Sequence, residues 1–176
     1  MTTAPTIETA RLRLRGFCAS DHDAFADYCA NPETMRFLGG PIEKADAWRR
    51  LATLAGQWML LGYGPFAVEE RASGRFAGYA GPWFPFGWPE PEIMWGLHRD
   101  FHARGIATEA AGAARDWAYD VLGWTTSISL IHPDNQASQR VAERLGATRD
   151  GEFTIRGLTV EVHRHPAPVK ERPTIN

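Results

Sequence analysis

A short glycine-containing loop between an expected strand and an alanine-faced helix constrains the fold more than any other segment of this chain. The pattern at 92–97 is typical of a strand, and the loop His102-Ala103-Arg104-Gly105-Ile106-Ala107-Thr108 follows it. The sequence then predicts a helix over 108–122, with Ala107, Ala110, Ala111, Ala114, Ala118 and Val121 on one side. Because these side chains are small, the helix can pack close to a sheet, and we expect a layered α/β fold.

The loop itself has the features of an anion-binding site. The first N–H groups of a helix have no partner inside the helix, and the helix dipole adds partial positive charge there. Gly105 can adopt backbone angles that other residues avoid, and Ala107 leaves room for a ligand. The loop lacks the Lys-Ser/Thr end of a P-loop and the three glycines of a dinucleotide fingerprint. It therefore indicates either a site for another phosphate-bearing ligand or only a tight strand-to-helix turn.

The remaining strands are expected in an order that excludes a strict βαβ repeat. We expect them at 11–15, 65–70, 75–81, 92–97, 126–131 and 159–164, with a hairpin turn at 71–74. A loop rich in proline and aromatic residues is expected at 82–91. This order predicts a single mixed α/β layer.

Three further helices are expected from their caps and apolar faces. Ser20 is a candidate N-cap, with Asp23 three residues later, and Pro133-Asp134-Asn135 is a helix start for 135–145, which Gly146 would end. A helix over 44–61 would end at Gly62. Its apolar face is expected to contain Trp48, Leu51, Ala52, Ala55, Trp58 and Met59.

The composition of the 176 residues is that of one globular domain. Hydrophobic residues make up 44% and charged residues 23%, and the chain is long enough for a sizeable core. We assign residues 1–165 to this domain and 166–176, which contains three prolines, to a C-terminal tail. We expect a monomer or a homodimer.

Charge and cysteine content limit the partners that we expect. The formal net charge is -2 without a basic cluster, which argues against nucleic acid. We see no apolar run that could cross a bilayer and no signal-peptide pattern at the start, so we expect no membrane partner. Cys18 and Cys29 are expected to be reduced thiols, and the His, Cys and acidic residues show no metal-ligand spacing. A cytoplasmic protein without a metal is the resulting expectation.

Four segments, in order and in register, resemble the GNAT superfamily of N-acetyltransferases. Residues 102–107 are similar to its Gln/Arg-x-x-Gly-x-Gly/Ala loop, although His102 replaces the usual Gln or Arg. Within that superfamily, 105–110, 7–15, 31–38 and 132–147 resemble the RimJ/RimL-type branch, the ribosomal-protein N-terminal acetyltransferase-like group. Together they extend over roughly residues 7–165.

The resemblance implies a fold and a cofactor. The expected fold is a single α/β (α+β layered) domain with a mixed, mostly antiparallel central sheet, helices on both faces, and fourth and fifth strands that splay apart. Acetyl-CoA is then expected in the gap, with its pyrophosphate on the loop amides. The implied cofactor contacts, chiefly through the backbone, are Arg104, Gly105, Ile106, Ala107, Thr108 and Asn135, the last also acting as a helix N-cap.

The resemblance also suggests residues for proton transfer. Acyl transfer from a thioester needs a neutral amine near the carbonyl and an acid for the departing thiolate. Glu92 stands where the family often has a Glu that deprotonates the amine through water; alternatively it is an exposed strand residue in a salt bridge. Ser138 stands where the branch has a Ser that protonates or hydrogen-bonds the CoA sulfur; alternatively it only satisfies backbone donors. Another group of the superfamily uses a Tyr one turn later, where this chain has Ala142.

The expected activity is acetyl transfer from acetyl-CoA to a primary amine, on a protein N-terminus or a small molecule, by direct attack in a ternary complex. The alternative is a non-catalytic domain of the same fold that binds or senses acyl-CoA. The aromatic segment 83–88, with Met35 and Phe37, either walls an apolar acceptor pocket or caps the open end of the sheet. His163 and His165 are expected to be structural.

Overall fold

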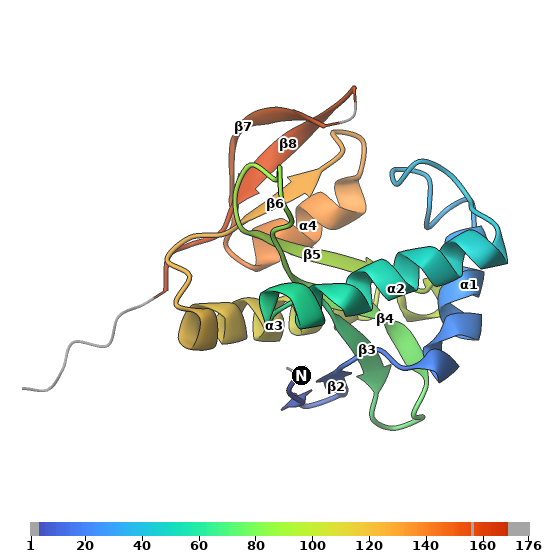
Figure 1. Ribbon diagram of the computed structural model, residues 1–176. Helices are drawn as coiled ribbons and strands as arrows, with labels where there is room; N and C mark the ends of the chain where they lie inside the picture. The colour runs from blue at the N-terminus through green and yellow to red at the C-terminus, as the bar shows by residue number, and fades with distance from the viewer. Residues whose placement is uncertain (1–3, 156, 169–176) are drawn as a thin grey trace, which may run out of the picture.

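The computed structural model describes residues 4–155 and 157–168, which form one eight-stranded sheet with helices on both faces (Figure 1). In chain order the elements are β1 (Ile7–Glu8), β2 (Leu12–Arg15), η1 (Ala19–Asp21), α1 (His22–Ala30), α2 (Lys44–Leu61), β3 (Phe66–Glu70), β4 (Phe76–Trp83), β5 (Glu92–Leu97), η2 (Arg99–Phe101), α3 (Ile106–Leu122), β6 (Ile128–Ile131), α4 (Gln136–Arg144), β7 (Thr148–Ile155) and β8 (Leu158–Arg164). The strands lie in the order β1-β2-β3-β4-β5-β6-β8-β7. The expected α/β fold, with a mostly antiparallel sheet, is confirmed.

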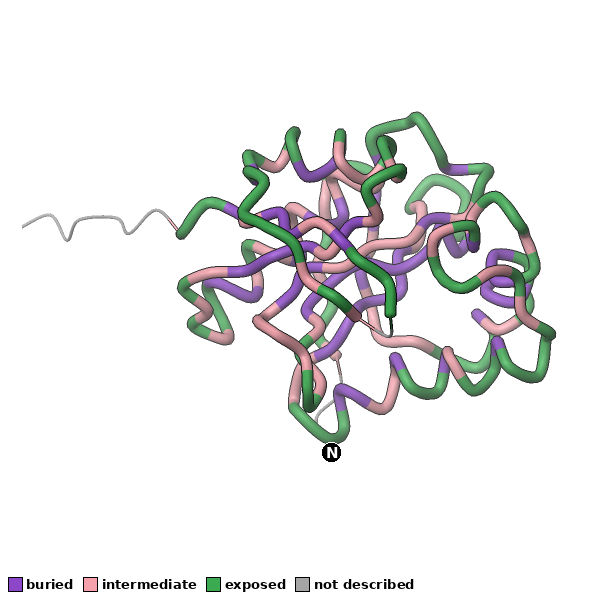
Figure 2. The backbone as a smooth tube through the Cα atoms, turned by 90° about the horizontal axis from the view of Figure 1, so that it is seen from above, coloured by how far each residue is buried: buried purple, intermediate pink, exposed green. Residues whose placement is uncertain are grey.

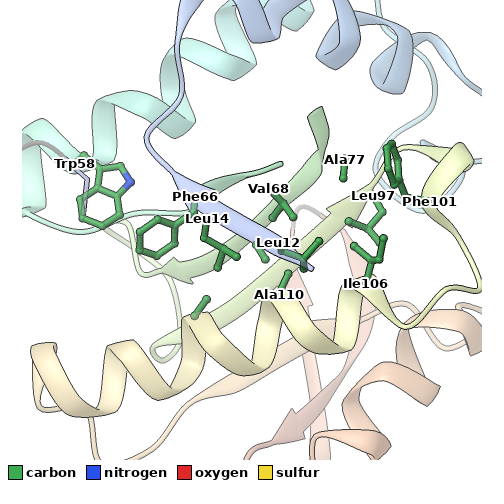
Figure 3. Packing of buried hydrophobic residues seen from close by; sticks show 12 residues of the cluster. Leu12, Leu14, Trp58, Phe66, Val68, Ala77, Leu97, Phe101, Ile106 and Ala110 are labelled. Atoms are coloured by element: carbon green, nitrogen blue, oxygen red, sulfur yellow. The ribbon is translucent and has the colours of Figure 1, made fainter. Parts of the chain in front are cut away.

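Two buried clusters lie on opposite faces of the sheet, because successive side chains of a strand point to opposite sides. On one face, Phe66 and Val68 of β3 pack with the alanines of α3, which lies directly along the strands in Figure 3. On the other, Ala67 belongs to a cluster with residues of α1 and α2. Figure 2 shows the buried backbone gathered in the centre and the exposed segments at the periphery. The small face of α3 is thus confirmed as a sheet-packing surface.

One pair of neighbouring strands is paired far less than the others. β4 and β5 are antiparallel and in register along the whole of β5, whereas the parallel strands β5 and β6 are paired only at Glu92 and Ile128. These are the fourth and fifth strands expected from the sequence, and the short β1 shifts their labels by one. The expected divergence of this pair is confirmed, and the unpaired carboxyl ends of β5 and β6 leave a gap in the backbone ladder of the sheet.

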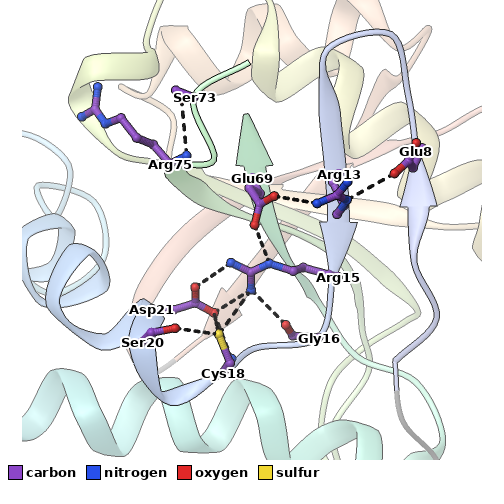
Figure 4. Close-up of polar contacts among 10 residues, drawn as sticks. All are labelled: Glu8, Arg13, Arg15, Gly16, Cys18, Ser20, Asp21, Glu69, Ser73 and Arg75. Carbon is purple, nitrogen blue, oxygen red and sulfur yellow. Dashed lines mark hydrogen bonds and ion pairs between the residues drawn. The ribbon is translucent and has the colours of Figure 1, made fainter. Parts of the chain in front are cut away.

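The start of the first helix was predicted wrongly. Ser20 is not its N-cap, because 19–21 form a 3-10 turn and α1 begins at His22. The buried Asp21 carboxylate instead accepts the Cys18 N–H at 2.9 Å and pairs with Arg15 at 2.8 Å (Figure 4). Because Arg15, at the end of the preceding strand β2, orients Asp21, the Ser20–Asp23 capping pattern alone cannot locate this helix start.

Other boundaries and faces also differ from expectation. α3 begins two residues earlier, β4 extends through Trp83, and β6 begins at 128 rather than 126. Met59 and Val121 are exposed, and Trp48 is 44% exposed, although all three were expected on buried faces. The face of α2 that packs inward consists of Ala47, Leu51, Leu54, Gln57 and Trp58. Helical spacing allows more than one face, and the neighbouring elements decide which is buried.

β7 was not predicted as a strand, since its residues are mostly exposed and it pairs only with β8 at the edge of the sheet. The division between a domain ending at 165 and a tail at 166–176 stays a prediction, because 169–176 lie outside the described residues. Before that point, the Tyr119 hydroxyl donates to the Pro166 carbonyl at 3.1 Å. Among the described helices, none is long and apolar enough to cross a membrane.

Candidate active site

The loop between η2 and α3 has an unusual backbone. Gly105 is the N-cap of α3 and has φ +75°, and Ala103 has φ +56°, the one non-glycine residue in this left-handed region among those described. For a residue with a Cβ this conformation costs about 1 kcal/mol. The loop therefore holds a strained backbone conformation directly before the first N–H groups of α3, and left-handed residues of this kind occur in the backbone concavities that bind anions.

The first turn of α3 has free donors. Its first helical hydrogen bond joins the Glu109 N–H to the Gly105 carbonyl at 3.1 Å, and no side chain caps the helix start. The preceding N–H groups of Ile106, Ala107 and Thr108 thus have no acceptor in the described chain. With the helix dipole, they form an anion site made of backbone.

The side chains of this loop are engaged elsewhere. The Arg104 guanidinium pairs with Glu70 and lies over the Phe101 ring, Ile106 is buried, and the Thr108 hydroxyl is buried without a partner. Arg104 and its neighbours are therefore available to a ligand through their backbone. Backbone contacts from these residues to a cofactor stay a prediction.

Two side chains from the connection between β1 and β2 hold the loop in place, and no sequence pattern indicated them. Arg11 donates from Nη1 to the Arg104 carbonyl at 2.8 Å and from Nε to the Glu109 carboxylate at 2.7 Å. Thr9 donates its hydroxyl to the same carboxylate at 2.6 Å. Arg11 and Glu109 both lie inside segments used for the resemblance, but their contact spans 98 positions and has no local signal.

Where β5 and β6 diverge, side chains replace one rung of the backbone ladder. After the Ile128 N–H donates to the Pro91 carbonyl at 2.9 Å, a regular parallel pair would join the Leu130 N–H to the Ile93 carbonyl. Instead the Leu130 N–H donates to Oε1 of Glu92 at 3.1 Å, and the Ser129 hydroxyl donates to the Ile93 carbonyl at 2.6 Å. Both groups are satisfied while the strands separate.

Glu92 is therefore buried at the narrow end of the gap. Its side chain is 6% exposed, and Oε2 accepts the Trp88 indole N–H at 2.7 Å. The alternative of an exposed Glu in a salt bridge is wrong. Burial raises the pKa of the Glu92 carboxyl to about 7, although the N–H bonds from Leu130 and Trp88 act in the opposite direction. A carboxyl with this pKa can exchange protons near neutral pH.

The other side of the gap is formed by β6 and the start of α4. Asn135 is the N-cap of α4, as predicted, and its Oδ1 accepts the Ser138 N–H at 3.1 Å. The half-buried Ser138 hydroxyl lies on the first turn of this helix. The predicted residues thus come from the two elements that frame the gap: Glu92 from β5, the anion loop after β5, and Asn135 and Ser138 after β6.

The family follows from comparison with known proteins. A family model described as an acetyltransferase (GNAT) domain matches residues 11–148. The chain belongs to this family. It is accordingly an acyltransferase enzyme, with the divergent strand pair and the loop before α3 at the places expected from the resemblance.

Individual relatives agree with this assignment. The solved acetyltransferase from Agrobacterium tumefaciens strain C58 is 33% identical, with a TM-score of 0.83 over 92% of this chain and 94% of that one. "Uncharacterized N-acetyltransferase YnaD" of Bacillus subtilis strain 168 is 26% identical over 148 residues, 84% of this chain and 85% of its own. An aminoglycoside acetyltransferase solved with coenzyme A shares the fold at 17% identity and a TM-score of 0.73, over 88% and 94% of the two chains.

In this acetyltransferase, the apolar residues expected around the gap divide between the core and the surface. Met35 is fully buried in the cluster under α1 and α2, so it does not wall a pocket. Phe37, in the connection between α1 and α2, stacks on His132 after β6 with ring centroids 4.8 Å apart. Phe86 is fully exposed, whereas Trp88 turns inward to Glu92. The segment 83–88 therefore both supports the site and presents an aromatic surface beside it.

Both C-terminal histidines of the acetyltransferase are buried and hydrogen-bonded. His163 contacts Glu161 at 3.0 Å, and His165 contacts the Ser129 hydroxyl at 2.9 Å. Across residues 4–155 and 157–168, no three His, Cys, Asp or Glu side chains gather as metal ligands.

Proposed function

We propose that this acetyltransferase transfers an acetyl group from acetyl-CoA to a primary amine by direct attack while both substrates are bound. The observation that carries the proposal is the Glu92 carboxyl, buried at the point where β5 and β6 separate, with its pKa raised to about 7. A base of this kind is suited to an amine nucleophile near neutral pH.

The loop before α3 fits the phosphorylated end of acetyl-CoA. The free N–H groups of 106–108 provide donors at the start of the helix, Gly105 adds no side chain of its own, and the helix dipole favours negative charge there. Asn135 has its Oδ1 occupied by the Ser138 N–H, so its side-chain amide N–H groups are the part that would contact the cofactor. When bound, acetyl-CoA supplies the activated thioester.

Glu92 and Ser138 would share the proton transfers. Glu92 takes the proton that the amine loses as its nitrogen bonds to the acetyl carbon, directly or through one water. Ser138 donates a hydrogen bond or a proton to the sulfur as the carbon–sulfur bond breaks. Glu92 then releases the amine proton to solvent. The thiolate, or the Ser138 alkoxide left after proton donation, takes a proton from solvent, so that CoA leaves as the thiol and both side chains return to their starting states.

The acceptor would be the amine of a protein or peptide N-terminus, or of a small molecule. Two solved ribosomal-protein acetyltransferases, from Vibrio cholerae and Vibrio fischeri, share the fold at 20% and 18% identity, which bears on architecture alone. Phe86 is exposed in the connection between β4 and β5, just before Glu92, and it favours an acceptor with an apolar portion.

Two-substrate kinetics test the direct transfer. Initial rates are measured while acetyl-CoA and the best acceptor of an amine panel are both varied, with mass spectrometry of the protein after acetyl-CoA alone. Intersecting double-reciprocal lines and an unmodified protein are expected. Parallel lines together with an acetylated protein would overturn attack in a ternary complex.

A further inference from the structure

Between β5 and β6, the backbone hydrogen bond from the Leu130 N–H to the Ile93 carbonyl is missing, and the Glu92 side chain alone does not account for its absence. A buried carbonyl without a donor is unfavourable, so the Ile93 carbonyl would normally accept the Leu130 N–H and close the strands. The Ser129 hydroxyl prevents this by donating to that carbonyl at 2.6 Å. Ser129 is 2% exposed, so water does not readily replace it.

The direction of the bonds around Ser129 follows from chemistry. A carbonyl cannot donate, so the Ser129 hydroxyl proton lies toward Ile93, and Oγ must accept from Nε2–H of His165 at 2.9 Å. Nδ1 of His165 then carries a lone pair and is buried without a partner in the described chain.

His165 remains in this neutral form across the ordinary pH range. Burial lowers its pKa to about 4, with smaller contributions from Arg115 on α3 and His163 on β8. A protonated ring would place a second N–H where no acceptor stands. His165 therefore acts as a permanent donor that orients Ser129.

We propose that Ser129 and His165 are positioning residues that hold β5 and β6 apart and keep the Glu92 carboxylate on the Leu130 N–H. This inference rests on the proposed function, because it assigns the gap to acetyl-CoA and the carboxyl to the amine. Neither residue touches the reacting atoms. Ser129 acts through the Ile93 carbonyl, and His165 acts through Ser129.

Removal of the hydroxyl has two consequences. The Ile93 carbonyl takes the Leu130 N–H, which extends the parallel ladder by one rung and narrows the gap. Glu92 then loses one of its two N–H donors, and because such bonds favour the ionised carboxylate, its pKa rises further. The affinity for acetyl-CoA should therefore fall. At the same time, the fall of kcat at low pH (the acidic limb of the pH profile) should move to higher pH.

The test compares Ser129→Ala with Ser127→Ala. Ser127 is a matched control, because it is also fully buried and its hydroxyl bonds to Tyr119 at 2.8 Å rather than to β5. Ser129→Thr keeps the hydroxyl, and His165→Phe keeps the ring volume but removes the donor. For each variant, calorimetry gives the Kd of acetyl-CoA, kinetics give KM, kcat and the pH profile, and thermal unfolding gives Tm.

The two serine variants are expected to lose similar stability but to differ in function. Ser129→Ala should raise the Kd of acetyl-CoA about tenfold, the loss that corresponds to about 1.4 kcal/mol, and shift the acidic limb of kcat to higher pH. His165→Phe should change the Kd and the acidic limb in the same direction but by less. Ser127→Ala should leave the Kd and the acidic limb unchanged. Ser129→Thr should restore the wild-type values where it folds.

Equal effects of Ser127→Ala and Ser129→Ala on Kd and on the pH profile would overturn the positioning role. The positioning role would also be overturned if a folded His165→Phe protein kept both the wild-type pH profile of kcat and the wild-type Kd of acetyl-CoA. These failures differ from failure of the proposed function, which would appear as a wild-type protein without amine-dependent turnover.

Discussion

Oε1 of Glu92 lies 3.1 Å from the Leu130 amide nitrogen, where a continuous parallel ladder would place the Ile93 carbonyl. Together with the Ser129 hydroxyl, which donates to the Ile93 carbonyl, the Glu92 side chain ends the pairing of β5 with β6 and is itself buried there. The burial that follows gives the carboxyl a pKa suited to proton transfer. In this acetyltransferase, the opening of the sheet and the tuning of the base have the same structural cause.

Replacement of Glu92 by Gln should slow acetyl transfer and change its pH dependence. Wild-type kcat is expected to fall as the pH decreases through about 7, because protonated Glu92 cannot accept a proton. Glu92→Gln should lower kcat by about 100-fold or more and remove this acidic limb. The measurement is kcat against pH at saturating substrates, and an unaltered profile would assign the base elsewhere.

The same substitution should change the pH dependence of stability. The folded pKa of Glu92 is raised, so its stabilising contribution is present at low pH and is lost as the pH rises through about 7. Between pH 5 and 8, Glu92→Gln should gain up to about 3 kcal/mol in the free energy of unfolding relative to wild type. Urea unfolding at several pH values measures this difference. A constant difference would show that the carboxyl is not buried in the ionised state.

Gly105→Glu should weaken acetyl-CoA binding more than tenfold. It strains a residue with φ +75° and places a carboxylate at the anion site. Gly123→Glu is the matched control, because Gly123 has φ +70° at the other end of α3 with open space around it. Calorimetry with acetyl-CoA compares the two. Equal losses of affinity would attribute the effect to backbone strain instead of to the loop.

Ser138→Ala should lower kcat about tenfold or more with little change in the KM of the acceptor. The helix start should remain intact, since Asn135 accepts the backbone N–H of residue 138 and not its hydroxyl. Steady-state kinetics and thermal unfolding together measure the effect. An unchanged kcat in the folded variant would leave Ser138 as a helix-start residue only.

Local patterns were sufficient for the elements that local chemistry determines. The alanine face of α3, the bounds of α2 and the Asn135 cap follow from spacing and capping within a few residues, and the structure confirms them. The resemblance added the divergence of β5 and β6, which no single segment encodes. Exposed β7 has no apolar alternation, so it gave no strand signal.

The environment of the site could not be predicted, because its contacts join distant positions. Glu92 meets Leu130 across 38 positions, and Ser129 meets His165 across 36. Neither residue of the second pair stands in a recognisable motif, and their roles depend on a missing rung that exists only once the sheet is formed. Burial of Glu92 was likewise invisible, since an isolated strand Glu is usually exposed.

Amine-dependent release of free CoA from acetyl-CoA tests the central claim most directly. Wild-type protein is incubated with acetyl-CoA and a panel of N-terminal peptides, polyamines, aminoglycosides and small amino compounds, and free thiol is measured over time. The structure predicts release that at least one amine stimulates and that Glu92→Gln reduces strongly. Tight acetyl-CoA binding without release stimulated by any of these amines would contradict it.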